Sequence, residues 1–166
     1  MAYLLDADVF IRAKNLHYGF DFCPGFWAWL VQANAKGRVY STEKVGDEIK
    51  AGDDRLAEWG RERGEGFFLA PTPEVLEALG RVADWANSQD YQLTAIDTFL
   101  QVADYYLVAH AVAGGYRVVT HEIPSSSRNR IKIPNVCIGL SVKCLTPYEM
   151  LRREKVRLVL RETETS

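Results

Sequence analysis

The sequence has little cysteine, no long hydrophobic run and no excess of positive charge, and each shortage excludes a class of protein. Its three cysteines, Cys23, Cys137 and Cys144, form no C-x-x-C pair, which argues against a disulfide framework or a zinc site. No stretch approaches the roughly 18 apolar residues that span a membrane, and no secretory leader opens the chain. A net charge of −2 gives no bulk attraction to nucleic acid. We expect a cytoplasmic protein with no membrane partner.

The sequence also lacks the common enzyme signatures. It contains no G-x-G-x-x-G or Walker loop, and no Ser-His-Asp or Cys-His arrangement emerges from it. Its 166 residues are 48% hydrophobic and 25% charged, which is ordinary for a globular protein. This length and composition predict a single folded domain over residues 1–166.

Short apolar segments alternate with helical patterns along the chain. Thr-Pro pairs at 72–73 and 146–147 are typical of helix starts. The alternation predicts an α/β fold with a largely parallel sheet. Strands are predicted at residues 2–6, 38–41, 66–70, 116–120 and 135–139, and helices at 24–36, 42–51, 53–64, 72–89, 95–115 and 146–160. The tail, residues 161–166, is predicted to be disordered.

Two carboxylates, Asp6 and Asp8, follow the first apolar run in "LLDADVF". Both flanking segments, residues 3–5 and 9–11, are β-prone, and a central strand rarely contains a charge. At the end of a strand, an acid can face a metal or a crevice. A solvated turn or a helix N-cap is the alternative interpretation.

Three further acids occupy comparable places. Glu122 follows the predicted strand in "VVTHE", Glu48 lies in the helix after the second strand, and Asp104 lies in an apolar helix. Burial of Asp104 is costly unless it is paired or coordinated. The alternatives are a helix-start or salt-bridged Asp104, a solvated helix face for Glu48 and a loop acid for Glu122.

Ligands of parallel α/β sheets gather outside the carboxyl ends of the strands. Four acids at that edge would repel one another strongly unless divalent cations neutralised them. Carboxylate and water ligands suit Mg²⁺ or Mn²⁺ better than zinc. The sequence therefore predicts an Mg²⁺ or Mn²⁺ site there.

A basic loop follows this acidic set. Arg128, Arg130 and Lys132 lie in "SSSRNRIKIP", where they are placed to bind phosphates, or they belong to a solvated loop. Arg12, after the first strand, is a weaker candidate of the same kind. His121 lies beside Glu122 and is a candidate for substrate contact. The aromatic segment 17–29 is compatible with core, an oligomer interface or base stacking.

Taken in order, these motifs resemble the PIN-domain nucleases, in an uncharacterised prokaryotic branch known as a domain of unknown function. The resemblance covers residues 3 to about 140 and depends on "YLLDADVFI", "VGDEI", "ADYYLVAHA" and "VVTHE". It implies a three-layer α/β/α sandwich and an acidic quartet of Asp6, Glu48, Asp104 and Glu122, with Thr120 as an accessory hydroxyl. It also implies hydrolysis of RNA with Mg²⁺ or Mn²⁺. Small PIN proteins are often toxins, which implies a cognate antitoxin and a homodimer as the usual unit.

Two departures from the family pattern concern the acids. Asp8 stands where PIN domains commonly have Asn, Ser or Thr, and it is a candidate fifth metal ligand or a cap. Glu122 stands where the family more often has Asp, so its carboxylate is one methylene further from the backbone.

Two other readings remain open. A phosphatase of the haloacid dehalogenase type also begins with a strand followed by D-x-D, with Asp6 as nucleophile and Asp8 as acid/base, but it leaves Asp104 unexplained. A PIN-like module that binds without catalysis is the second alternative, and it predicts metal binding without turnover.

Overall fold

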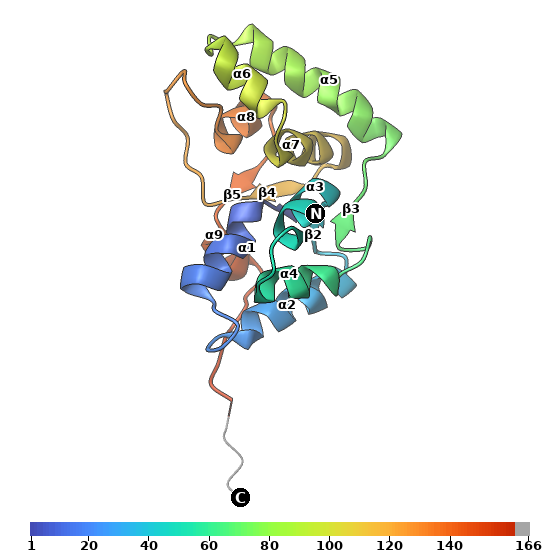
Figure 1. The fold of residues 1–166 in the computed structure, drawn as a ribbon, viewed down its shortest axis with the longest axis vertical. Helices are drawn as coiled ribbons and strands as arrows, with labels where there is room; N and C mark the ends of the chain where they lie inside the picture. The colour runs from blue at the N-terminus through green and yellow to red at the C-terminus, as the bar shows by residue number, and fades with distance from the viewer. Residues whose placement is uncertain (162–166) are drawn as a thin grey trace, which may run out of the picture.

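The computed structural model describes residues 1–161, and a five-stranded sheet lies at its centre (Figure 1). All neighbouring strands are parallel, and their order is β3-β2-β1-β4-β5. The α/β prediction with a parallel sheet is confirmed. The strands are β1 (Tyr3–Leu5), β2 (Val39–Thr42), β3 (Phe68–Leu69), β4 (Arg117–Val119) and β5 (Cys144–Leu145).

Helices cover both faces of this sheet, which gives the three layers that were expected. In Figure 1, α5 to α8 lie above the sheet, and α1, α2, α4 and α9 lie below it. They are α1 (Ala7–Arg12), the π-helical turn η1 (Ala13–His17), α2 (Pro24–Ala35), α3 (Glu43–Lys50), α4 (Arg55–Arg61), α5 (Pro73–Ser88), α6 (Leu93–Phe99), α7 (Ala103–Gly114), α8 (Ile133–Gly139) and α9 (Pro147–Arg153). Within residues 1–161, no helix has both the length and the apolar character needed to span a bilayer.

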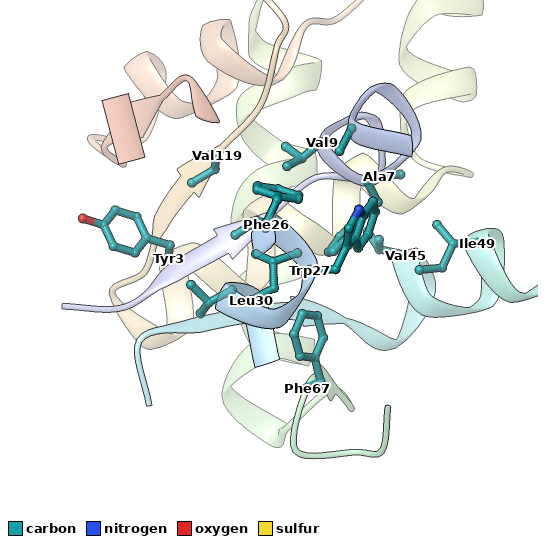
Figure 2. Close-up of a cluster of buried hydrophobic side chains, with 14 of the residues drawn as sticks. Tyr3, Ala7, Val9, Phe26, Trp27, Leu30, Val45, Ile49, Phe67 and Val119 are labelled. Carbon is teal, nitrogen blue, oxygen red and sulfur yellow. The ribbon is translucent and has the colours of Figure 1, made fainter. Parts of the chain in front are cut away.

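The central strand is apolar on both faces because both faces are covered. Successive strand side chains point to opposite faces. Tyr3 and Leu5 accordingly join one core with Phe26 and Trp27, while Leu4 joins the other core with the residues of α5 to α8. Figure 2 shows the first of these cores, in which Phe26, Trp27 and Leu30 of α2 lie among the other labelled apolar side chains.

The strand order reverses at β1. The chain passes from β1 to β2 and β3 on one side, then returns to place β4 on the other side of β1. Such a switch point opens a crevice outside the carboxyl ends of the two strands, where ligands of α/β proteins usually bind. The chain leaves β1 at Asp6 and β4 at Thr120, so the predicted acids begin at this crevice.

One predicted strand is wrong. Residues 135–139 belong to α8, and the last strand is β5. A short apolar run cannot be assigned to strand or buried helix by its pattern alone, and Pro134 suits the first turn of a helix. Residues 9–11 are likewise helical, because Asp6 caps α1 directly after β1.

The predicted helix over 95–115 is two helices, α6 and α7, which are separated by residues 100–102. Asp104 therefore lies in the first turn of α7. The last helix ends at Arg153 instead of residue 160, because Lys155 takes a left-handed conformation with φ of 54° and Val156 N–H bonds to the Leu151 carbonyl. Of the tail predicted to be disordered, residues 162–166 lie outside the described residues.

Candidate active site

Asp6 is fixed at the end of β1 by three hydrogen bonds. Its backbone N–H bonds to the Val119 carbonyl at 3.0 Å, and its Oδ1 accepts from the Ala7 N–H at 2.7 Å as the cap of α1. Its Oδ2 accepts from the Thr120 hydroxyl at 2.8 Å. Asp6 is only 4% exposed. The cap interpretation of Asp6 is therefore confirmed, and the same side chain also lines the cleft at this edge of the sheet.

Thr120 connects the two strand ends through its buried hydroxyl. The hydroxyl has one proton, which it donates to Asp6, and it accepts from the Glu122 N–H at 3.1 Å. Asp8 lies nearby, with its Oδ2 at 3.4 Å from the same hydroxyl and its Oδ1 accepting from the His121 N–H at 3.3 Å. The predicted accessory hydroxyl thus positions the first acid.

Glu122 has a structural role that sequence reasoning missed. Its Oε2 accepts from the Ile133 N–H at 2.8 Å, so it caps α8, whose own N-cap residue makes no side-chain hydrogen bond. Its Oε1 lies 3.4 Å from the Arg130 guanidinium. Both carboxylate oxygens are therefore already engaged by the loop and helix that follow.

Asp104 and Glu48 face the same crevice from the other side, on the packed helices α7 and α3. Burial, together with the charges of Glu122 and Glu48, raises the pKa of Asp104 to about 6, and the charge of Arg130 offsets part of this rise. Partial burial also raises the pKa of Glu48, although this side chain remains largely exposed. Both carboxylates carry negative charge that the protein compensates poorly.

The acids share one open cleft of about 590 Å³ at the switch point. Five acids line it: Asp6, Asp8, Glu48, Asp104 and Glu122. Burial raises the pKa of Asp6 well above its ordinary value, and repulsion from Asp8 and Asp104 adds to this effect. Uncompensated acids that raise one another's pKa are a mark of functional sites.

Divalent cations with oxygen ligands fit these donors chemically. Cation binding would replace the repulsion among the acids with attraction. Within residues 1–161, no three His, Cys, Asp or Glu side chains form a ready-made ligand cluster. The carboxylates least committed to other partners, Glu48 and Asp104, are those with most freedom to turn toward an ion.

The predicted phosphate-binding residues divide into two groups. Arg12, Arg130 and Lys132 line the acidic cleft, as expected for residues that meet a phosphate. Arg128 does not line it, because its guanidinium pairs with Asp90 at 2.5 Å and it is largely exposed. The basic loop therefore contributes two of its three cations.

His121 lines the cleft and forms an aromatic group that the sequence does not reveal. Its ring centroid lies 5.3 Å from that of His17 and 5.7 Å from that of Tyr148. The Tyr148 hydroxyl lies 3.1 Å from His17 Nε2. Because 131 positions separate His17 from Tyr148, no local pattern could have predicted the contact.

Comparison with known proteins gives one family. A family model described as a domain of unknown function, DUF4411, matches residues 3–158. Searches of curated proteins and of solved structures find no match to this chain.

Proposed function

The chain belongs to the DUF4411 family, a domain of unknown function, and we propose that it is a metal-dependent endoribonuclease that hydrolyses RNA phosphodiester bonds. Membership of the PIN-domain nucleases is part of this proposal. The observation that carries it is the convergence of five carboxylates on one open cleft at the strand-order switch point. A cleft with so much unneutralised negative charge suits a polyanionic substrate only when a cation is bound there.

Asp6, Asp8, Glu48 and Asp104 are the residues proposed to hold Mg²⁺ or Mn²⁺. Such an ion, when bound, lowers the pKa of a water molecule and stabilises the charge that develops on the phosphoryl oxygens. The protein supplies no covalent nucleophile in this proposal. Thr120 keeps the Asp6 carboxylate in place through the 2.8 Å hydrogen bond, so that its charge is positioned before the reaction begins.

Arg130, Lys132 and Arg12 are the proposed phosphate contacts. All three line the cleft beside the acids, and exposed cations at this position attract the RNA backbone without reading its sequence. Glu122 contributes indirectly, because its carboxylate holds both the start of α8 and the Arg130 side chain. It is a positioning residue for the basic loop.

The proposed cellular role is that of the toxin in a toxin–antitoxin pair, acting in the cytoplasm as a homodimer with a cognate antitoxin. This part of the proposal rests on the resemblance of the motifs to small prokaryotic PIN proteins.

A cleavage assay tests the proposed activity. The purified chain is incubated with single-stranded and structured RNAs in Mn²⁺ or Mg²⁺, and then with EDTA. Cleavage is expected only with the metal, and Asp6→Asn and Asp104→Asn are each expected to lower it by about a hundredfold or more. Asp47→Asn is the matched control, because Asp47 is exposed on α3 and does not line the cleft.

Other outcomes assign the cleft differently. Cleavage that survives EDTA, or that persists in Asp6→Asn and Asp104→Asn, would contradict the nuclease proposal. Hydrolysis of a phosphomonoester with intact RNA, abolished by Asp8→Asn, would favour the phosphatase. Saturable Mn²⁺ binding without any turnover would favour the non-catalytic module.

A further inference from the structure

A second cleft, of about 850 Å³, adjoins the acidic one. Residues of α3, of the break between α6 and α7 and of the loop before α8 line it. Glu48, Asp104 and Arg130 line both clefts, so the two adjoin at these side chains. We call the second cleft the Tyr106 groove, after the aromatic side chain of α7 that lines it.

The Tyr106 groove differs from the acidic cleft in its chemistry. Lys44 lies in it with its ammonium 5.0 Å from the centre of the Tyr106 ring. Arg130 supplies a second cation at the junction with the acidic cleft, and Gln101 and Asn129 supply amide groups. The groove thus offers an aromatic ring and two cations beside the carboxylates.

These groups match the parts of a nucleotide. An aromatic ring stacks on any base, and a flexible cation binds phosphate. A cation over an aromatic ring at an exposed site is held weakly, and Lys44 is exposed, so its ammonium is free to leave the ring for a phosphate. A base can then take the ring face that Lys44 covers.

We propose that the Tyr106 groove binds the nucleotide next to the scissile phosphodiester and thereby selects unpaired RNA. This inference rests on the proposed nuclease function, because the acidic cleft at one end must receive the phosphodiester. A base stacks on Tyr106 only after it has left its own helical stack. A base inside a duplex must first be unpaired and unstacked, which opposes its binding. The groove volume lies within the range of small-ligand sites.

RNA binding without turnover tests the groove. The Asp6→Asn variant provides the background, because Asp6 does not line the Tyr106 groove. Fluorescence anisotropy compares a labelled unstructured RNA with the same RNA in a full duplex, in Mn²⁺. The single strand is expected to bind about tenfold tighter or better, and Tyr106→Ala is expected to lose about tenfold of that affinity. Tyr106→Phe keeps the ring and should keep the affinity.

Lys44→Ala gives the second arm. It is expected to weaken binding of the single strand and to lower the slope of log affinity against log salt by about one phosphate contact. Lys36→Ala is the matched control, because Lys36 is an exposed lysine at the end of α2 and lines neither cleft. This control should leave both quantities unchanged.

The outcomes separate this inference from the nuclease proposal. Equal affinity for the single strand and the duplex, or unchanged affinity in Tyr106→Ala, would overturn the role of the groove. Metal-dependent cleavage by the wild type would still support the nuclease proposal in that case. Cleavage that is unaffected by Asp6→Asn would overturn the nuclease site even if Tyr106→Ala weakened RNA binding. Absence of RNA binding by the Asp6→Asn variant would overturn the groove.

Discussion

The two sides of the acidic cleft are built differently. On the β1–β4 side, Asp6 and Glu122 accept hydrogen bonds from the hydroxyl of Thr120 and from backbone N–H groups. On the α3–α7 side, no hydrogen bond within residues 1–161 reaches the carboxylate of Glu48 or Asp104, and burial raises both pKa values. Hydrogen bonds therefore hold the carboxylates of the first side in place, whereas those of the second side can turn toward a bound cation.

This difference separates stability from function. A carboxylate whose oxygens are already bonded contributes geometry, and its loss disturbs the fold. A carboxylate that is buried beside other acids destabilises the fold when it is charged, which is typical of functional groups. Removal of the Thr120 hydroxyl on the first side and of the Asp104 charge on the second should therefore change stability in opposite directions.

The largest expected effect is a gain in stability from Asp104→Asn without divalent cations. The pKa of Asp104 is about 6 in the folded chain against an ordinary 3.8. As pH rises from 4 to 7, the unfolded chain releases this proton first, so stability falls by about 2–3 kcal/mol. Asp104→Asn removes this pH dependence, so at pH 7 the variant should be more stable than the wild type by about this amount. A small loss is expected because the variant lacks the negative charge that stabilises the N-terminal end of the α7 dipole. Urea unfolding of both proteins at pH 4 and pH 7, in EDTA, measures the difference in their free energies of unfolding.

The two proteins should be about equally stable at pH 4, where Asp104 is protonated. Asp47→Asn, on an exposed position of α3, should follow the wild type throughout. An Asp104→Asn variant less stable than the wild type at pH 7 in EDTA would show that Asp104 has a stabilising partner. The proposed difference between the two sides of the cleft would then be wrong.

Thr120→Val is expected to act in the opposite direction. It removes the hydroxyl that donates to Asp6 Oδ2 and accepts from the Glu122 N–H, while it keeps the shape of the side chain. Leaving these two groups unpaired should cost about 1–2 kcal/mol. Thr120→Ser, which keeps the hydroxyl, should recover most of this loss in the same urea titration. Equal stability of the Thr120→Val variant and the wild type would mean that the strand-end link is unimportant.

Glu122→Gln should have the smallest effect. The amide oxygen of glutamine can still accept from the Ile133 N–H, so only the charge is lost, at a cost below about 1 kcal/mol. RNA cleavage should stay within about tenfold of the wild type, because Glu122 positions the loop. A loss as large as that of Asp104→Asn would instead assign Glu122 to the metal site.

Local signals in the sequence identified the residues at the switch point. An apolar run followed by Asp6 marks the end of β1, and the Thr-Pro pairs at 72–73 and 146–147 begin helices as predicted, with both threonines as N-caps. Parallel strands with covered faces then bring their carboxyl ends together, which is why Asp6 and Glu122 could be placed at one edge in advance.

The remaining features depend on contacts between distant residues. The helix α8 starts where Glu122 caps it, and a pattern of apolar residues contains no information about that bond. Arg128 turns toward Asp90, so its position in a basic loop did not predict its neighbours. The contact between Lys44 of α3 and Tyr106 of α7 likewise joins residues that are distant along the chain, and no local pattern predicts it.

Calorimetric titration of Mn²⁺ at pH 6 tests most directly whether the acids form a divalent cation site. It is run in two buffers of different ionisation enthalpy, with the wild type, Asp104→Asn and Asp47→Asn. The account predicts saturable binding with release of part of a proton, since Asp104 is about half protonated at this pH. Asp104→Asn should lose both the saturable Mn²⁺ binding and the proton release, and Asp47→Asn should keep both. Absence of saturable binding, or equal binding and proton release in Asp104→Asn, would contradict the account.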